Sequence, residues 1–129
     1  MSIISDVLRK EFPIYNISFT DEMLSSFNLY SKLLIDWNNK INLTAIVDPR
    51  EIAIKHFLDS ALLLNALEIK NEARVIDIGT GAGFPGLPIK ILRNDINLTL
   101  LDSLNKRLIF LEEVTSKLKI NAEILHLRA

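Results

Sequence analysis

All four glycines of this 129-residue chain fall within one short stretch, RVIDIGTGAGFPGL at residues 74–87. Val75, Ile76 and Ile78 surround Asp77 and lead directly into the glycines, a pattern typical of a buried parallel strand followed by a loop. Glycine permits positive φ and has no Cβ, so the backbone of such a loop can approach a ligand closely. A tight turn without a ligand is the alternative, but a turn needs one glycine rather than four.

The spacing of the glycines fits two types of ligand. Read from Asp77, the pattern is D-x-G-x-G-x-G with Gly79, Gly81 and Gly83. Read from Gly81, it is G-x-G-x-x-G, the dinucleotide fingerprint, which alone is a weak signal. A dinucleotide would bring a pyrophosphate to the helix N-terminus, where Asp77 would repel it. Asp77 instead suits a ligand with a cationic or hydroxyl-rich part, such as the aminoacyl portion of S-adenosylmethionine. The first pattern is favoured, and an NAD-dependent oxidoreductase is the alternative.

The composition indicates a folded protein without disulfides. Hydrophobic residues make up 49% of the chain and the formal net charge is −1, values typical of a protein with a core. No apolar run approaches the roughly 18 residues of a transmembrane helix. The first residues include acids and lack a basic start, so we expect no secretory signal. The chain has no cysteine, which excludes thiolate chemistry and fits a cytoplasmic location.

The first half of the chain reads as a helical section. Thr20 is a suitable N-cap for the second helix, either Thr44 or Asp48 could cap the third, and Pro13 is expected to stop the first helix. The apolar stripe of the second helix indicates packing on a core, with partner binding as the alternative. We expect helices over residues 3–12, 21–37 and about 49–67.

From Arg74 onward strands and helices alternate. We expect strands at 74–78, 97–101 and 122–127, and helices from about Gly86 and over 104–118. A β-α-β-α-β order with right-handed crossovers makes a parallel sheet. The predicted fold class is therefore α/β, with a helical section at 1–70 followed by a partial α/β domain at 71–129.

Asp102 is a second chemical landmark, because it follows the second predicted strand. Nucleotide-binding α/β folds place an acid at this point, where its carboxylate accepts hydrogen bonds from both hydroxyls of a ribose. Capping of the next helix by Asp102 or Ser103 is the other role, and the two are compatible. Lys106 and Arg107 on that helix could contact RNA phosphates or simply form a solvated face.

The helix at 49–67 carries a small polar group. His56 and Asp59 lie at i, i+3, next to Ser60. Two ligands without a third do not make a metal site, so no metal is predicted. From the spacing alone, an intrahelical polar pair is the simplest interpretation.

Four motifs together resemble a known family. They are K-x-N-L-T at 40–44, H-F-L-D-S at 56–60, D-I-G-T-G-A-G-F-P-G-L-P at 77–88 and L-L-D-S-x-x-K-R at 100–107. In this order they resemble the glucose-inhibited division protein B family, bacterial methyltransferases of small-subunit ribosomal RNA. The glycine motif alone indicates a methyltransferase. The F-P-G-L-P extension and the upstream H-x-x-D-S make the match specific.

The resemblance implies a Rossmann-like class I methyltransferase that uses S-adenosyl-L-methionine to methylate N7 of one guanosine in 16S ribosomal RNA. Cofactor contacts are then expected from Asp77, Gly79, Thr80, Gly81, Gly83, Phe84, Asp102, Ser103, Arg128 and Ala129. Pocket or substrate-side residues are expected at Asn42, Thr44, His56, Asp59, Ser60, Lys106 and Arg107.

No catalytic residue is predicted. Guanine N7 carries a lone pair and no proton, and the sulfonium is an excellent leaving group, so alignment of the reacting atoms suffices. Family members continue with further strands past residue 129, and a ligand cleft requires strands on both sides of the first strand. We therefore expect an N-terminal fragment that binds cofactor weakly and lacks methyl transfer. A non-catalytic binding or self-associating module is the remaining alternative.

Overall fold

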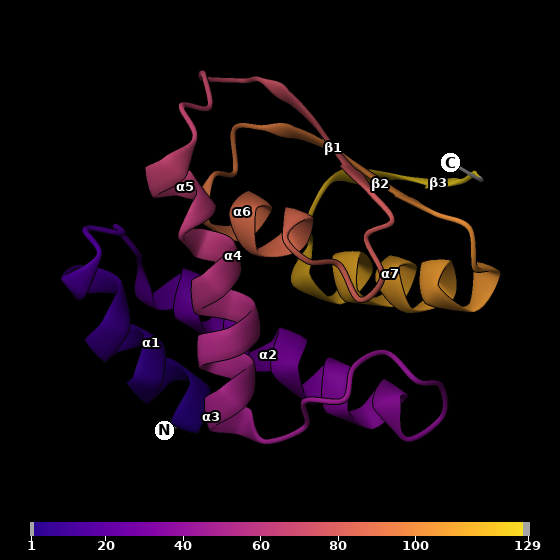
Figure 1. The fold of residues 1–129 in the computed structure, drawn as a ribbon, viewed down its shortest axis with the longest axis horizontal. Helices are drawn as coiled ribbons and strands as arrows, with labels where there is room; N and C mark the ends of the chain where they lie inside the picture. Colours follow the sequence, from indigo (N-terminus) through magenta and orange to yellow (C-terminus); the bar gives the residue numbers. More distant parts are fainter. Residues whose placement is uncertain (1, 128–129) are drawn as a thin grey trace.

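The computed structural model describes residues 2–127 and has one three-stranded sheet with helices (Figure 1). The first half forms helices only: α1 (Ile3–Ile14), α2 (Asp21–Asn38), α3 (Pro49–Glu51), η1 (Ile52–Leu58), α4 (Asp59–Ala61) and α5 (Leu63–Ala66). The second half alternates: β1 (Arg74–Ile78), α6 (Gly86–Leu92), β2 (Asn97–Asp102), α7 (Asn105–Leu118) and β3 (Ala122–His126). The predicted α/β fold class is confirmed.

The three strands are parallel and lie in the order β1-β2-β3. Asp77 is paired in register with Leu100, and Asp102 with His126. The carboxyl ends of β1 and β2 therefore meet at one edge of the sheet. This edge is where open parallel sheets bind their ligands.

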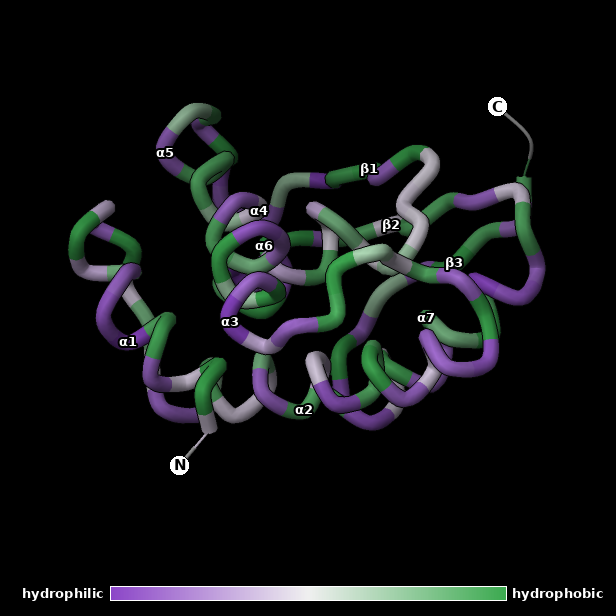
Figure 2. Tube along the Cα trace, turned by 60° about the horizontal axis from the view of Figure 1, so that its bottom comes forward, coloured by the Kyte–Doolittle hydropathy of each residue, from purple (hydrophilic) through white to green (hydrophobic). Residues whose placement is uncertain are grey.

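Helices cover one face of the sheet. α6 and α7 pack against the strands, and α2 packs against α6 and α7 from the other side, which gives three layers (Figure 1). On the opposite face no helix of residues 2–127 covers the sheet, and Ile76 and Ile78 are 61% and 64% exposed. These residues belong to β1, a hydrophobic strand (Figure 2) that pairs only with β2 in the described range.

An aromatic cluster joins the N-terminal helices to the loop after β1. Neighbouring rings have centroids 4.9 to 6.0 Å apart. Aromatic pairs at such distances add to the stability gained from burying their large apolar surfaces. The cluster consists of Phe12, Phe27, Tyr30, Phe57 and Phe84.

The predicted N-cap Thr20 is confirmed and Asp48 is the cap of α3 rather than Thr44, whereas the predicted end of α1 is wrong. The Thr20 hydroxyl accepts the Met23 N–H, and the Asp48 carboxylate accepts the Glu51 N–H. α1 continues through Pro13, because a proline in the last turn removes only one intrahelical hydrogen bond. The helix stops where Asn16 adopts a left-handed φ of 59°.

The expected single α-helix at 49–67 is instead a helical run with a π-helical centre, η1. At its end the Asp59 N–H donates to the Ile54 carbonyl, five residues back. A π turn is wider than an α turn and shifts the positions of the side chains that follow it. Such turns are frequent at functional sites, and this one holds His56 just before Asp59 and Ser60.

Neither a membrane-spanning helix nor a metal-binding cluster is found among the described residues. Among the helices within residues 2–127, none combines the length and the apolar character needed to cross a bilayer. The same residues contain no cluster of three or more histidine, cysteine, aspartate or glutamate side chains suited to hold a metal ion.

Candidate cofactor and substrate site

The loop after β1 adopts conformations that favour glycine. Gly79, Gly81 and Gly83 have φ values of 68°, 61° and 101°. A Cβ added at Gly79 or Gly81 would meet no atom within 4 Å, so these two residues border open space. A Cβ at Gly83 would collide with the Tyr30 hydroxyl and lie 2.6 Å from Leu87 Cδ1. The first two glycines therefore leave room for a ligand, and the third lets the loop pack against the core.

Asp77 braces both ends of this loop. Its Oδ2 accepts a hydrogen bond from the Thr80 hydroxyl at 2.7 Å and another from the Gly86 N–H at 2.9 Å. Burial raises the pKa of Asp77, while these two hydrogen bonds oppose the rise. Gly86 is required at this close approach, because an added Cβ would lie 2.9 Å from Asp77 Oδ2.

Asp102 is bonded within the chain through both carboxylate oxygens. Oδ2 accepts the Gly81 N–H at 2.8 Å, and Oδ1 accepts the Leu104 N–H at 3.0 Å. Arg107 lies 3.5 Å from Oδ1, and the Asp102 side chain is 2% exposed. Burial raises the pKa of Asp102, but the two N–H groups and Arg107 outweigh it, so the pKa lies below its ordinary value. Asp102 thus ties the glycine loop to the end of β2.

The capping alternative for Asp102 or Ser103 is wrong. The N-cap position of α7 is Leu104, which makes no side-chain cap bond. The Ser103 carbonyl instead accepts a hydrogen bond from His126 Nε2 at 2.9 Å. Lys106 is exposed on α7, next to the ion-paired Arg107. Arg128 and Ala129, expected beside the cofactor, lie outside the described residues.

Tyr30 holds the loop from the helical side, a role that the sequence did not reveal. This fully buried residue of α2 donates its hydroxyl hydrogen bond to the Ala82 carbonyl at 2.5 Å. Burial raises the pKa of Tyr30 well above its ordinary value, with a smaller contribution from Asp77. The apolar spacing of α2 indicates that Tyr30 or Ser31 faces the core, but no local signal indicates which carbonyl Tyr30 meets.

Phe84 lies between two rings. Its ring stacks on His56 with centroids 4.3 Å apart and planes 7° apart, and on Tyr30 at 5.5 Å. The His56 Nε2 is 2.8 Å from the Thr44 hydroxyl, so the segment before α3 also supports this stack. Burial lowers the pKa of His56, while Asp59 raises it to a smaller extent. Asn42, predicted near Thr44, is exposed and is absent from the cavity described next.

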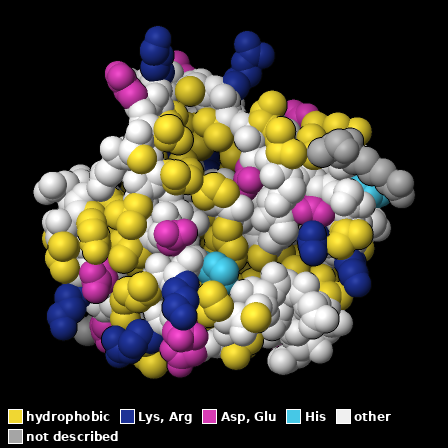
Figure 3. Space-filling view, in the orientation of Figure 1, with side chains coloured by type: hydrophobic (Ala, Val, Ile, Leu, Met, Phe, Trp, Pro, Cys, Tyr) yellow, Lys and Arg dark blue, Asp and Glu magenta, His cyan; other side chains and the backbone are white. Residues whose placement is uncertain are grey.

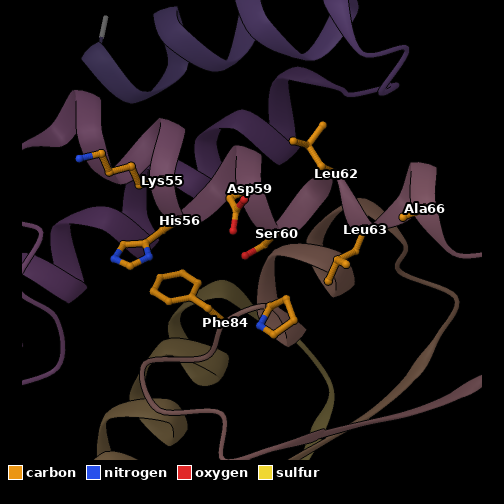
Figure 4. Close-up of a pocket in the computed structure, with 9 residues that line it drawn as sticks. Lys55, His56, Asp59, Ser60, Leu62, Leu63, Ala66 and Phe84 are labelled. Carbon is orange, nitrogen blue, oxygen red and sulfur yellow. The ribbon is translucent and has the colours of Figure 1, made fainter.

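A cavity of about 470 Å³ lies between the helical run and Phe84. Such a volume is typical of small-molecule sites. Hydrophobic side chains gather over α4 and α5 beside acidic ones on this face of the molecule (Figure 3). Asp59 and Ser60 point into the cavity from the helical run (Figure 4). The lining is Lys55, His56, Asp59, Ser60, Leu62, Leu63, Ala66, Phe84 and Pro85.

The hydrogen bonds of the loop indicate which ligands it can hold. The N–H groups of Gly79, Gly81 and Gly83 all donate within the chain, to Leu101, Asp102 and Thr80. Within residues 2–127, no backbone group outside regular helices and strands donates to the carbonyls of Gly79 and Gly81. The loop therefore offers carbonyl acceptors, which suit an ammonium group, whereas the N–H groups of its three glycines are already engaged and are not free to bind a pyrophosphate. This arrangement fits the amino-acid end of S-adenosylmethionine better than a dinucleotide.

Comparison with known sequences gives one consistent family. The family model described as "GidB: rRNA small subunit methyltransferase G" matches residues 23–129. A protein named ribosomal RNA small subunit methyltransferase G from Desulforamulus reducens is 51% identical over 130 residues, which cover 100% of this chain and 54% of the relative. Proteins of the same name from Clostridium perfringens SM101 and Clostridium botulinum Loch Maree are 50% and 48% identical, each over 96% of this chain and 52% of the relative. The chain spans about half the length of these curated relatives.

Proposed function

Because the chain belongs to the rRNA small subunit methyltransferase G family, we propose that the whole protein methylates N7 of a guanosine in 16S ribosomal RNA, with S-adenosylmethionine as the methyl donor. The observation that carries the cofactor assignment is the glycine loop. Gly79 and Gly81 border open space, and no backbone group outside regular helices and strands of residues 2–127 donates to their carbonyls. The proposed substrate places the protein in the cytoplasm.

The two sections of the chain have different proposed roles. Residues 71–129 hold the cofactor, and residues 1–70 support the loop and face the substrate. Support for this division comes from Tyr30 and His56, which both lie in the helical section and contact the loop residues Ala82 and Phe84. The loop is thus held from both sections.

The proposed cofactor contacts depend on the backbone more than on side chains. Gly79 and Gly81 accept the ammonium of the cofactor through their carbonyls, and Asp77 keeps the loop in the required shape. Thr80 and Gly83 act in the same way, through the packing of the loop. When bound, the cofactor supplies an electrophilic methyl group on a sulfonium.

We propose that Asp102 receives the ribose hydroxyls, beside Ser103. In the structure its Oδ2 is bonded to the Gly81 N–H, so binding requires that the ribose share or replace this hydrogen bond. The Gly81 N–H would then donate to the ligand. Arg128 and Ala129 stay predictions for the adenine side.

The chain needs no general base for this reaction, because guanine N7 carries no proton. Its residues position the two reactants and exclude water. Lys106 is proposed as a contact to RNA phosphates, since it is exposed and makes no ion pair within residues 2–127. Arg107 is engaged with Asp102 and is a weaker candidate.

Two experiments test the proposal. Calorimetric titration of this chain with S-adenosylhomocysteine should show saturable binding, whereas NAD should not bind. The whole protein should transfer a methyl group to small-subunit RNA that contains guanosine, but not to RNA in which 7-deazaguanosine replaces the target. Binding of NAD in preference to S-adenosylhomocysteine, or methylation of the 7-deaza substrate, would contradict the proposal.

A further inference from the structure

The cavity beside Phe84 contains polar groups that have no hydrogen-bond partner among residues 2–127. Ser60 is a largely buried residue of the cavity wall, and its hydroxyl points into the cavity and forms no hydrogen bond within residues 2–127 (Figure 4). Asp59 lines the same cavity, and no lysine or arginine of that range lies within 4.0 Å of its carboxylate. Lys55, one turn earlier, is paired with Glu51 at 3.3 Å. The Ser60 hydroxyl and the Asp59 carboxylate are therefore available to form hydrogen bonds with a ligand in the cavity.

The rest of the cavity is apolar. Leu62, Leu63 and Pro85 supply hydrophobic surface, and the stacked rings of His56 and Phe84 close one end. A flat ligand with polar atoms on one edge matches such a lining. Nucleobases that are turned out of an RNA stack have this character and are read by their Watson–Crick edge in an apolar pocket.

We propose that this cavity receives the target guanine, with the Asp59 carboxylate accepting its N1–H and exocyclic amine and the Ser60 hydroxyl donating to its O6. This inference rests on the proposed function, and it names Asp59 and Ser60 as the residues that select the base. The edge of guanine reads O6, N1–H, N2–H, which is one acceptor followed by two donors. Ser60 and Asp59, adjacent in sequence, provide one donor followed by two acceptors.

Adenine, cytosine and uracil cannot form the same set of hydrogen bonds with Asp59 and Ser60. Adenine and cytosine place an unprotonated ring nitrogen where guanine has N1–H, and that lone pair would face the Asp59 carboxylate. Uracil offers one N–H between two carbonyls, so it can satisfy one carboxylate oxygen only. The paired donors of guanine therefore distinguish it from the other three bases.

The position of N7, the atom to be methylated, explains why the protein should hold the Watson–Crick edge of guanine. Proteins commonly read guanine in duplexes by directing arginine or lysine to O6 and N7. A methyltransferase for N7 cannot use that contact, because the donor would occupy the lone pair that attacks the methyl group. Holding N1 and N2 leaves N7 free on the opposite side of the base. Phe84 borders both the cavity and the glycine loop, so the cavity adjoins the proposed cofactor space.

Mononucleotide binding to this chain tests the inference. Guanosine, inosine and adenosine 5′-monophosphates are titrated while amide signals of residues 55–66 are followed by NMR, with and without S-adenosylhomocysteine. The guanosine nucleotide should bind most tightly, the inosine nucleotide more weakly because it lacks the amine, and the adenosine nucleotide weakest. Asp59→Asn should weaken guanosine nucleotide binding roughly ten- to a hundredfold, the range for hydrogen bonds to a charged group.

Matched variants separate this inference from the proposed function. Ser60→Ala should give a smaller loss than Asp59→Asn, and Glu68→Gln, an exposed acid outside the cavity, should give none. S-adenosylhomocysteine affinity should stay the same in all three. Equal binding of the guanosine and adenosine nucleotides, no nucleotide binding, or an unaffected Asp59→Asn variant would overturn the inference while leaving cofactor binding intact. If the protein without substitutions does not bind S-adenosylhomocysteine, that result would count against the proposed function instead.

Discussion

The Gly81 N–H donates to Asp102 Oδ2 at 2.8 Å, so the glycine loop after β1 is tied directly to the end of β2. Replacing Asp102 with alanine removes the acceptor of two backbone N–H groups and the partner of Arg107. We expect the free energy of unfolding to fall by about 2–3 kcal/mol, because hydrogen bonds to charged groups are lost. Urea denaturation measures this loss, and Glu112→Ala on the exposed side of α7 is the control.

The same variant tests the proposed ribose contact. Affinity for S-adenosylhomocysteine should fall by about 1–3 kcal/mol in conditions where the variant stays folded. Unchanged affinity would show that Asp102 serves the loop alone.

Tyr30→Phe tests the attachment of the loop to α2. The substitution leaves the buried Ala82 carbonyl without its donor, which should cost about 1–3 kcal/mol of unfolding free energy. Tyr15→Phe is a matched control, since Tyr15 is 39% exposed. If the two variants denature at the same urea concentration, Tyr30 does not hold the loop.

Gly83→Ala and Gly79→Ala should have different effects: the first should mainly lower stability, and the second should mainly weaken ligand binding. At Gly83 a Cβ collides with the Tyr30 hydroxyl and Leu87, so we expect a stability loss above about 2 kcal/mol from strain and overpacking. At Gly79 the added methyl group enters open space, so the loss should stay near the roughly 1–2 kcal/mol of a left-handed alanine. Gly79→Ala should nevertheless weaken S-adenosylhomocysteine binding in calorimetry. Equal stability of the two variants would contradict the packing described for Gly83.

The pKa of Asp77 gives a prediction with a definite sign. Burial raises this pKa above the ordinary value of 3.8, so the folded state binds a proton more readily than the unfolded state. The contribution of Asp77 to stability therefore decreases as pH rises from 3.8 through the folded pKa. Asp77→Asn keeps an acceptor for Thr80 and Gly86 and should flatten this part of the pH profile. Urea midpoints between acid and neutral pH measure it; identical profiles would rule out the raised pKa.

His56 should titrate below its ordinary pKa of 6.5, because burial favours the neutral ring. Its contribution to stability is present above the unfolded pKa and is lost as pH falls through the folded pKa. Asp59 raises the pKa of His56, so Asp59→Asn should lower that pKa further. NMR titration can follow it directly, because His126 is the only other histidine. A pKa that rises in Asp59→Asn would contradict the assigned interaction.

Local patterns in the sequence were sufficient for the positions and the parallel direction of the strands, whereas the expected burial of β1 is wrong, because its residues are exposed or half-buried. Asp77 and Asp102 could be placed at one sheet edge because parallel strands bring their carboxyl ends together. The resemblance based on four motifs is confirmed by the family match over residues 23–129. That match gives no support to the nicotinamide alternative.

Other features depend on tertiary contacts that no local pattern encodes. The π-helical turn of η1 has no signal in the local sequence, and α1 continues through Pro13 because a proline in the last turn of a helix costs little. The hydrogen bond from the Gly81 N–H to Asp102 joins residues that are far apart in sequence, so the sequence did not predict it. The roles assigned to the individual site residues stay predictions.

The hydrogen bond from Tyr30 to Ala82 spans 52 residues of sequence. Closing a loop of that length costs chain entropy, so this hydrogen bond depends on the other contacts that hold α2 against the rest of the protein. The glycine loop cannot reach its final shape until α2 has docked, even though β1 and α6 lie next to it in sequence. Partly folded chains therefore lack an ordered loop, and the ability to bind a ligand there is acquired together with the fold itself.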